Sequence, residues 1–446
     1  MTVSAVAAAV YDDDDWDADD FVLVERGLMS TVRKTRRMGF GDNPGVWQWI
    51  AVKTATTNRR FSKQPHDVIK ELRLLASLSH LNVIQLFDHT HDQSSMHLWM
   101  PFIPLSFDCV LNSPSFSPSN LTSGFLVLAK SLTFQIISAI AYLHSPPQSI
   151  AHRDIKPRNV LLTEYGCAKL IDFGISWKSD ETEEQKQFDL WPEGSEEMCT
   201  AVSTGPYRSP ELLFGPKSYN AFATDLWSLG ATLAELFTPL ELIRSSSSTP
   251  SDSDTNSSAE SEQADLSSEP RPFIVPPKAR NALDEHDDEW KWVRKSLFDG
   301  TRGELGLLWS IFKTMGTPND QTWPGFKTLS DARSVSFNQV PAVPLDSKFP
   351  NLPPPTHPDM RSHALDFISK LLVYPPEDRL HAQDALSHPF LTCDEVPLLL
   401  PPNYAQLREG QDHLETQVVF NWEGMSLGDL LKQILASGGQ QSDEGE

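Results

Sequence analysis

The sequence is poor in cysteine and in positive charge. Its four cysteines, at positions 109, 167, 199 and 393, are far apart, and no CxxC pair occurs. This spacing excludes a small disulfide scaffold and a sequence-local zinc site, and it favours a reducing compartment, the cytoplasm or the nucleus. Lys and Arg number 37 against 60 Asp and Glu, which gives a net charge of −23. So large a negative charge predicts no nucleic-acid partner and no attachment to acidic membranes.

Long apolar runs are also lacking. No run of about 18 apolar residues occurs, so we expect no segment that spans a membrane. The opening MTVSAVAAAV has no basic region and leads directly into aspartates, so we do not interpret it as a signal peptide. Acid concentrates in two segments of low complexity, residues 1–20 and an insertion at about 243–289. We predict that the first is disordered and that the second is a solvated loop.

The apolar pattern predicts a strand-rich part followed by a helical part. Strands are expected at 21–24, 47–53, 82–91 and 96–102, with one amphipathic helix at 67–80. Helices are expected at 125–144, 223–237 and 361–372, with a further amphipathic segment at 425–435 in a tail over 393–446. This order of elements is typical of an α+β protein.

The most specific string is His152-Arg153-Asp154-Ile155-Lys156-Pro157-Arg158-Asn159, which fits the H-R-D-x-x-x-x-N catalytic loop of protein kinases. The chemistry explains the spacing, because an aspartate must accept the proton of an incoming hydroxyl and a later amide oxygen must reach a metal ion. We therefore predict that Asp154 is the catalytic base and that Asn159 is a metal ligand. Lys156 can neutralise charge on the moving phosphoryl group.

Asp172-Phe173-Gly174 follows at the end of a short predicted strand. The Asp172 carboxylate is predicted to bind Mg²⁺ that bridges the phosphates of ATP. Ala51 and Lys53 share one face of a predicted strand, which leaves room for a flat base beside a lysine that reaches the phosphates. Glu71 lies in the apolar stripe of a predicted helix, where a glutamate needs a counter-charge. We predict that Lys53 supplies it.

These motifs resemble those of eukaryotic protein kinases over about residues 21–392. The resemblance implies a two-lobed α+β fold, with a small antiparallel β lobe and one helix over 21–103 and a mainly helical lobe over 104–392. It also implies ATP and Mg²⁺ as cofactors. The nucleotide would contact residues from both lobes, namely Val24, Gly27, Val32, Ala51, Lys53, Leu161 and a hinge at 100–103 that includes Met100, Phe102 and Ile103.

Within the kinases, the chain is similar to the cyclin-dependent kinase (CDK) group. Residues 65–71 (PHDVIKE) resemble its PSTAIRE helix, and residues 204–215 (TGPYRSPELLFG) resemble its T-x-W-Y-R-A-P-E-x-L-x-G segment. Residues 308–318, followed by WPG at 323–325, resemble its segment ending L-G-T-P…W-P-G. The run ELLFG is most like the CDK-activating kinase branch. By resemblance, Glu211 would be a buried acid and Arg379 its cationic partner.

The chain departs from the pattern at the phosphate-covering loop, where Glu25, Gly27 and Ser30 occupy the three glycine positions. Loss of glycine restricts the approach of the backbone to phosphate, so nucleotide affinity is expected to be weak.

The activation segment, 172–211, is long and acidic. In the family, three arginines hold a phosphothreonine in this segment; Lys70, Arg153 and Trp177 stand at their positions here. Cys199 occupies the phosphosite, with Thr200 adjacent. Two arginines are missing and lysine cannot reproduce the bidentate fork, so we expect activation by phosphorylation to be weak or absent.

We interpret the chain as an active serine/threonine kinase, most similar to a single-chain CDK-activating kinase that phosphorylates another CDK. Lys156 and Thr204 support Ser/Thr specificity. One alternative is a cyclin-partnered CDK; the leading interpretation does not require a cyclin. A second alternative is a pseudokinase scaffold, which the degraded glycine loop favours, although Lys53, Glu71, Asp154, Asn159 and Asp172 are all present.

Overall fold

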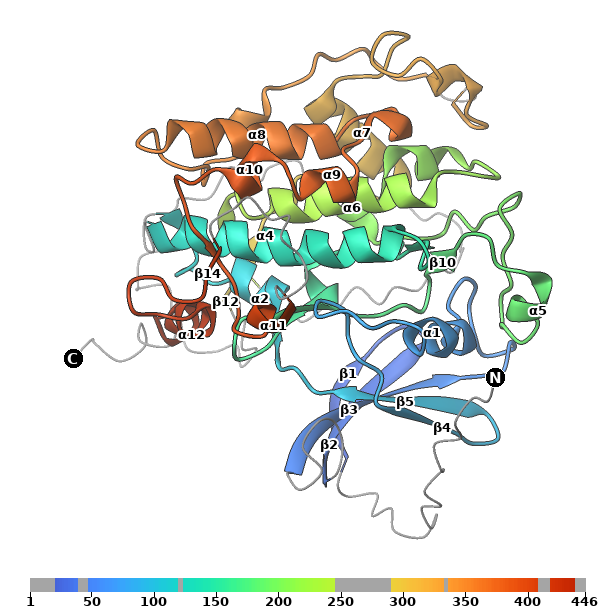
Figure 1. The fold of residues 1–446 in the computed structure, drawn as a ribbon. Coiled ribbons are helices and arrows are strands. Elements are labelled where there is room, and N and C mark those ends of the chain that lie inside the picture. The colour runs from blue at the N-terminus through green and yellow to red at the C-terminus, as the bar shows by residue number, and fades with distance from the viewer. Residues whose placement is uncertain are drawn as a thin grey trace, which may run out of the picture.

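The computed structural model describes residues 21–38, 47–118, 123–244, 290–332, 336–407 and 418–437. The acidic segment 1–20 lies outside the described residues, as does nearly all of the predicted insertion at 243–289. The described chain forms a small antiparallel sheet with one helix beside a larger, mainly helical lobe (Figure 1). The predicted two-lobed α+β arrangement is therefore confirmed.

The first lobe is a five-stranded antiparallel sheet in the order β1-β2-β3-β5-β4. Its strands are β1 (Val22–Arg26), β2 (Ser30–Met38), β3 (Trp47–Thr56), β4 (Asp88–His91) and β5 (Ser95–Pro101). Side chains alternate along β3, so Ile50 and Val52 pack with Trp99 on one face. Ala51 and Lys53 consequently point to the other face, as predicted.

The strand predicted at 82–91 begins only at Asp88. Val83 and Ile84 are buried in the main core, and Val83 forms only an isolated bridge to Leu170. The side-chain amide of Asn82 donates to the carbonyl of Ala168, 2.9 Å away. Tertiary packing therefore holds this apolar run as an irregular crossing between the lobes.

Helix α1 (Val68–Leu75) is shorter than the helix predicted at 67–80. Asp67 caps its start, where its carboxylate accepts hydrogen bonds from the backbone N–H groups of Ile69 and Lys70. The backbone N–H and hydroxyl of Ser77 both bond to the carbonyl of Leu74, and this turn ends the helix. Glu71 is buried on the apolar stripe of α1, as predicted.

The second lobe is built around helices α4, α6, α7 and α8, which span Ser123–His144, Ala221–Ala234, Gly303–Met315 and Pro358–Leu371. Shorter helices are α2 (Phe107–Leu111), α5 (Glu183–Lys186), α9 (Ala382–Ala385) and α10 (Pro389–Thr392). The predicted helices at 125–144, 223–237 and 361–372 are thus confirmed, with shifted ends. Helix α7 was not predicted, because Gly303 and Gly306 lie in its first turn and glycine is a poor helix former.

Short strands connect these helices and carry the catalytic segments. They are β6 (Leu105–Ser106), β7 (Ile150–Ala151), β8 (Val160–Leu162), β9 (Ala168–Leu170), β10 (Trp177–Lys178), β11 (Leu240–Arg244) and β12 (Trp290–Arg294). Strands β6, β8 and β9 form one small sheet in that order. Strands β11 and β12 pair at the base of the insertion, so its first two residues, 243 and 244, belong to a strand.

Helix α4 is long and strongly apolar. An 18-residue window within Gly124–His144 has a mean hydropathy of 1.7, and α4 is the one described helix long and apolar enough to cross a membrane by length and composition. However, 89 % of that window is buried inside the fold. Its apolar surface is therefore accounted for by core packing.

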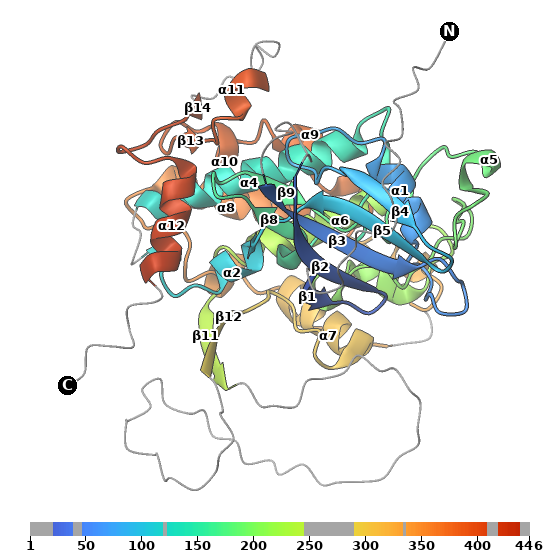
Figure 2. The same cartoon turned by 90° about the horizontal axis from the view of Figure 1, so that it is seen from below.

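The described part of the tail is packed against the second lobe (Figure 2). It contains β13 (Leu398–Leu399), α11 (Tyr404–Leu407), β14 (Val418–Val419) and α12 (Leu427–Ser437), which includes most of the amphipathic segment predicted at 425–435. The Lys130 amine on α4 is buried and donates to the carbonyls of Cys393, 2.6 Å away, and Val396, 2.7 Å away. At Gly428 an added Cβ would lie 2.2 Å from the carbonyl oxygen of Glu164, so only glycine allows α12 to approach this closely.

Candidate active site

A cavity of about 710 Å³ lies between the two lobes. Its wall includes Gly27, Val32, Ala51, Lys53 and Leu161, all of which were predicted to surround a nucleotide. Met100, which was predicted to belong to the hinge, also lines it. Strands β1 to β3 thus cover the cavity from one side while the second lobe closes it from the other.

Three residues predicted to contact the nucleotide do not line this cavity. Val24 lies at a β-bulge in β1, where its side chain is exposed. Phe102 packs against Trp49 at 6.4 Å between ring centroids, and Ile103 is buried in the main core. The bulge and these apolar contacts turn the three side chains away from the space that they were expected to face.

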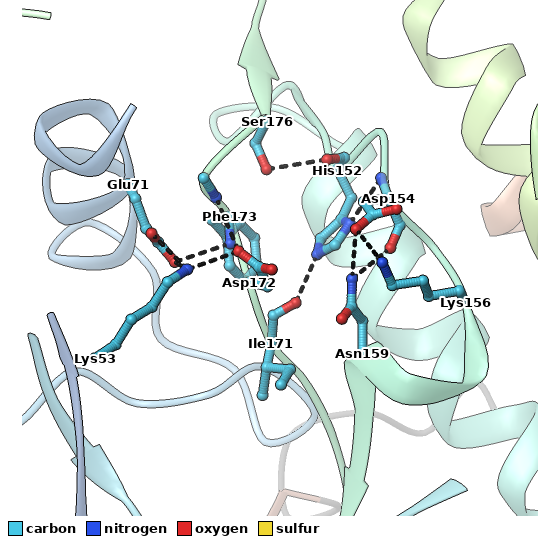
Figure 3. Close-up of polar contacts among 11 residues, drawn as sticks. Lys53, Glu71, His152, Asp154, Lys156, Asn159, Ile171, Asp172, Phe173 and Ser176 are labelled. Carbon is cyan, nitrogen blue, oxygen red and sulfur yellow. Dashed lines mark hydrogen bonds and ion pairs between the residues drawn. The ribbon is translucent and has the colours of Figure 1, made fainter. Parts of the chain in front are cut away.

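Lys53 joins two carboxylates at the back of the cavity (Figure 3). Its amine lies 2.7 Å from Glu71 Oε1, which confirms the predicted ion pair, and 2.7 Å from Asp172 Oδ1. Burial alone would lower the pKa of Lys53, but the charges of Asp172 and Glu71 outweigh it and raise this pKa above its usual value. Burial would raise the pKa of Asp172, yet the nearby Lys53 charge holds it well below its usual range. Both groups are therefore charged at neutral pH.

Asp154 is surrounded by the residues predicted to work with it (Figure 3). The Asn159 amide donates to Asp154 Oδ2 at 2.9 Å, and the Lys156 amine lies 2.8 Å from the same oxygen. The Thr204 hydroxyl donates to Asp154 Oδ1 at 2.7 Å and accepts from the Lys156 amine at 2.8 Å. Thr204 lies in the activation segment, so these bonds join that segment to the catalytic loop.

Asp225 supports the catalytic loop from below and was not predicted as a site residue. It is fully buried on α6 and accepts hydrogen bonds from the backbone N–H groups of His152 and Arg153, both at 2.7 Å. Arg153 has a φ of 65°, which is uncommon for a residue with a side chain and requires such support. A charged residue inside the apolar helix pattern at 223–237 was the signal that could have revealed Asp225.

The predicted Glu211–Arg379 pair is confirmed. The Arg379 guanidinium donates to both carboxylate oxygens of Glu211, each at 2.7 Å, and both side chains are buried. The guanidinium also donates to the carbonyls of Ala223 and Val373. This pair anchors the end of the activation segment on the second lobe.

The family model of the protein kinase domain matches residues 34–391, which is most of the chain. The chain belongs to the protein kinase family. Its two-lobed fold is therefore the protein kinase fold, and the chain is a kinase, a phosphotransferase. The match begins at Lys34, so the degraded glycine loop lies outside the matched residues.

Members of this family bind ATP with Mg²⁺, and the donors in this kinase's cavity fit that cation. Asp172 offers a charged carboxylate, the ligand type that Mg²⁺ prefers. Both donated bonds of the Asn159 amide go to Asp154, which leaves the amide oxygen as the group that can bind a cation. Among the described residues no cluster of three or more His, Cys, Asp and Glu side chains could hold a metal, so further ligands would come from phosphate and water.

Glu235 is expected to make the stability of this kinase depend on pH. It is buried beneath the activation segment and accepts from the Tyr207 hydroxyl at 2.8 Å and the Ser296 hydroxyl at 2.7 Å. Burial raises the pKa of Glu235 from 4.5 to about 7, against the lowering effect of these two hydrogen bonds. As pH rises from 4.5 to 7, the unfolded carboxyl loses its proton while the folded one keeps it, so the folded state binds more protons and stability falls.

We therefore expect Glu235→Gln, which keeps the acceptor oxygen and removes the charge, to melt several degrees higher than the wild type at pH 8. The difference should nearly vanish at pH 5, where the folded wild type carries a neutral Glu235. Melting curves at both pH values measure it, with the exposed Glu241→Gln as a control for net charge. A gain that is equal at the two pH values would contradict this assignment.

Proposed function

We propose that this kinase is an ATP-dependent serine/threonine kinase of the CDK group, active as a single chain in the cytoplasm or nucleus. Its proposed substrate is the activation-segment threonine of another CDK. The hydrogen-bonded set of Asp154, Lys156 and Thr204 is the observation that carries the proposal. It places a carboxylate and an amine on the wall of the cavity, where a substrate hydroxyl could meet the γ-phosphate.

The proposed mechanism assigns each step to a residue of this chain. Asp154 accepts the hydroxyl proton of the substrate as the oxygen attacks, while Lys156 offsets the charge that develops on the transferred phosphoryl group. Lys53, held by Glu71, positions the phosphates. Asp172 and Asn159 would hold Mg²⁺, which neutralises phosphate charge when bound. Gly27, Val32, Ala51 and Leu161 would surround the nucleotide.

Two observations support the finer parts of the proposal. Thr204 bonds to both Asp154 and Lys156, which is the arrangement expected of a serine/threonine kinase. The Lys53–Glu71 pair is formed in the single chain, so α1 already stands in the position that phosphate binding requires. The CDK assignment rests on the three sequence strings described above. The proposed role in activating another CDK rests on the ELLFG run.

The direct test uses the purified, phosphatase-treated chain with Mg²⁺ and radiolabelled ATP. The substrate is a catalytically dead CDK, and its matched control has the activation-segment threonine replaced by alanine. Label on the first protein and not on the second supports the proposal. Label on neither protein, with label on a generic serine/threonine substrate, would overturn the activating role and leave the kinase assignment intact.

A pseudokinase scaffold is the second candidate, because Glu25, Gly27 and Ser30 replace the glycine loop and Glu25 adds a charge that repels phosphate. A thermal-shift titration with Mg·ATP separates the two candidates. Binding of Mg·ATP without transfer to any protein would favour the scaffold.

We expect Thr200→Ala to change turnover by less than about twofold. We expect the same small change when the wild type is treated with phosphatase. The reason is that Lys70 and Trp177 replace two clamp arginines, so a phosphate at Thr200 would gain few charge-assisted bonds. The Thr200 carbonyl, by contrast, accepts from Arg208 at 2.6 Å and is untouched by the substitution. Steady-state assays of the Thr200→Ala variant and of the phosphatase-treated wild type, each with and without an added cyclin, measure these changes in turnover. A large loss of turnover would favour the cyclin-partnered alternative.

A further inference from the structure

Arg153 of the catalytic loop is already paired with an acid of the activation segment. Its fully buried guanidinium donates to both oxygens of Glu193, at 2.6 Å and 2.8 Å. Glu193 Oε1 also accepts from the backbone N–H of Cys199, 2.7 Å away. Bidentate pairs of this kind fix both partners in orientation as well as in distance. Glu193 therefore joins the catalytic loop to the position where a regulatory phosphate was expected.

We propose that Glu193 is a positioning residue for phosphoryl transfer, and that its carboxylate acts as a permanent substitute for the phosphate of the activation segment. The inference rests on the proposed kinase function and extends it to regulation. In this arrangement Glu193 supplies the anion, Arg153 receives it, and the segment folds without modification.

The bonds of Arg153 show how Glu193 would act on the reacting groups. The Arg153 guanidinium donates to the carbonyl of Ile175 at 2.8 Å, near the start of the activation segment. Its own carbonyl accepts from the Ser203 hydroxyl at 2.8 Å, near the end of that segment. Ser203 precedes Thr204, which bonds to Asp154. Fixing Arg153 therefore fixes both ends of the segment around the catalytic base.

The charges around Glu193 match one carboxylate. The Glu193 pKa would be raised by burial, but its bonds to Arg153 lower it, so the carboxylate is ionised. Lys70 is buried nearby, and its amine has no hydrogen-bond partner among the residues that the structure describes. Burial, together with the charge of Arg153, lowers the pKa of Lys70. The site thus holds one strong cation, Arg153, for one carboxylate, Glu193. A doubly charged phosphate added beside Glu193 would find no second guanidinium to bind it.

The same acidic segment is also held against α1 (Figure 1). Arg73 on α1 bonds to Glu181 and, at 2.7 Å, to Asp189. The backbone N–H of Trp191 donates to the carboxylate of Asp67, the cap of α1, at 2.8 Å. Glu193 is therefore the last of several contacts that fix the segment between α1 and the catalytic loop.

The test compares Glu193→Gln, which removes the charge and keeps the shape, with Glu196→Gln, an exposed acid of the same segment. We expect Glu193→Gln to lower kcat by about 10- to 100-fold, the range for losing a charged hydrogen bond, with little change in KM for ATP. Glu196→Gln should stay within about twofold of the wild type. Glu193→Asp should recover part of kcat, because it restores the charge.

Rescue with an added anion distinguishes positioning from a general loss of fold. In Glu193→Ala the space beside Arg153 opens, so inorganic phosphate should raise its kcat while the wild type is not stimulated. A Glu193→Gln variant with more than half of the wild-type kcat would overturn the proposal. So would a Glu193→Ala variant that melts like the wild type and shows no response to phosphate.

Hydrogen exchange keeps the proposal testable if the variants fail to fold or the wild type transfers no phosphate. In the phosphatase-treated wild type, the Cys199 amide, which donates to Glu193, should be protected, whereas exchange at the rate of a free peptide would overturn the role of Glu193. Absence of transfer to any protein would overturn the proposed function, and protection of the Cys199 amide would still support the Glu193 contact.

Discussion

Asp154→Asn is expected to lower phosphoryl transfer by about 10²- to 10⁴-fold, the usual loss when a general base is removed. Asparagine cannot accept the hydroxyl proton. In the wild type, the Lys156 amine and the Asn159 amide both donate to the Asp154 carboxylate. The side-chain amide of the new asparagine would place its own N–H donors among these two donors. Nucleotide binding should be nearly unchanged, because Lys53 and Asp172 are untouched. Single-turnover transfer and a Mg·ATP thermal shift measure the two effects separately.

Asp172→Ala is the matched comparison for that experiment. It removes the carboxylate that holds the Lys53 amine at 2.7 Å and that is assigned to Mg²⁺, so binding and transfer should be lost together. The contrast between the two variants assigns their roles. Near-normal turnover in Asp154→Asn would show that another group accepts the proton.

Arg379→Met is expected to produce the largest loss of stability, about 3–5 kcal/mol in the free energy of unfolding. The substitution leaves the Glu211 carboxylate buried without its cation, and it removes donors from the carbonyls of Ala223 and Val373. Urea unfolding monitored by tryptophan fluorescence measures the loss. Activity should also fall, because Glu211 anchors the end of the activation segment.

Lys370→Met provides the control for Arg379→Met. Lys370 pairs with Asp366 at 2.7 Å, but about half of each side chain is exposed. Such a surface pair contributes only about 0–1 kcal/mol. If the two substitutions lowered stability equally, the Glu211–Arg379 pair would not be the anchor described above.

Much of this site could be predicted because its residues lie at fixed spacings within short segments. The catalytic loop brings Asp154, Lys156 and Asn159 together by local geometry alone. The pairs Lys53–Glu71 and Glu211–Arg379 could be anticipated for other reasons. Glu71 was expected to be buried on an apolar stripe, where an acid needs a cation, and the Glu211–Arg379 pair was implied by the resemblance to kinases.

Other features depend on tertiary packing that the local pattern does not record. The run at 82–87 satisfies a strand pattern, yet Val83 and Ile84 are buried in the main core. Val24, Phe102 and Ile103 were placed by resemblance, but a bulge and local apolar contacts turn them away from the cavity. Glu193 is one of many acids in its segment, and no spacing distinguishes it before Arg153 is placed beside it.

The packing of the tail on α4 has a consequence for how this kinase is made. Lys130 finds its partner at Cys393 only after 263 further residues have been synthesised. At about 5–20 residues per second, translation leaves that amine, and the surface of α4 around it, uncovered for roughly 13–53 s. During this interval the nascent chain exposes apolar surface that the finished protein buries. The surface of α4 around Lys130 is therefore covered only late in synthesis, and the demand on chaperones falls on the incomplete chain at the ribosome.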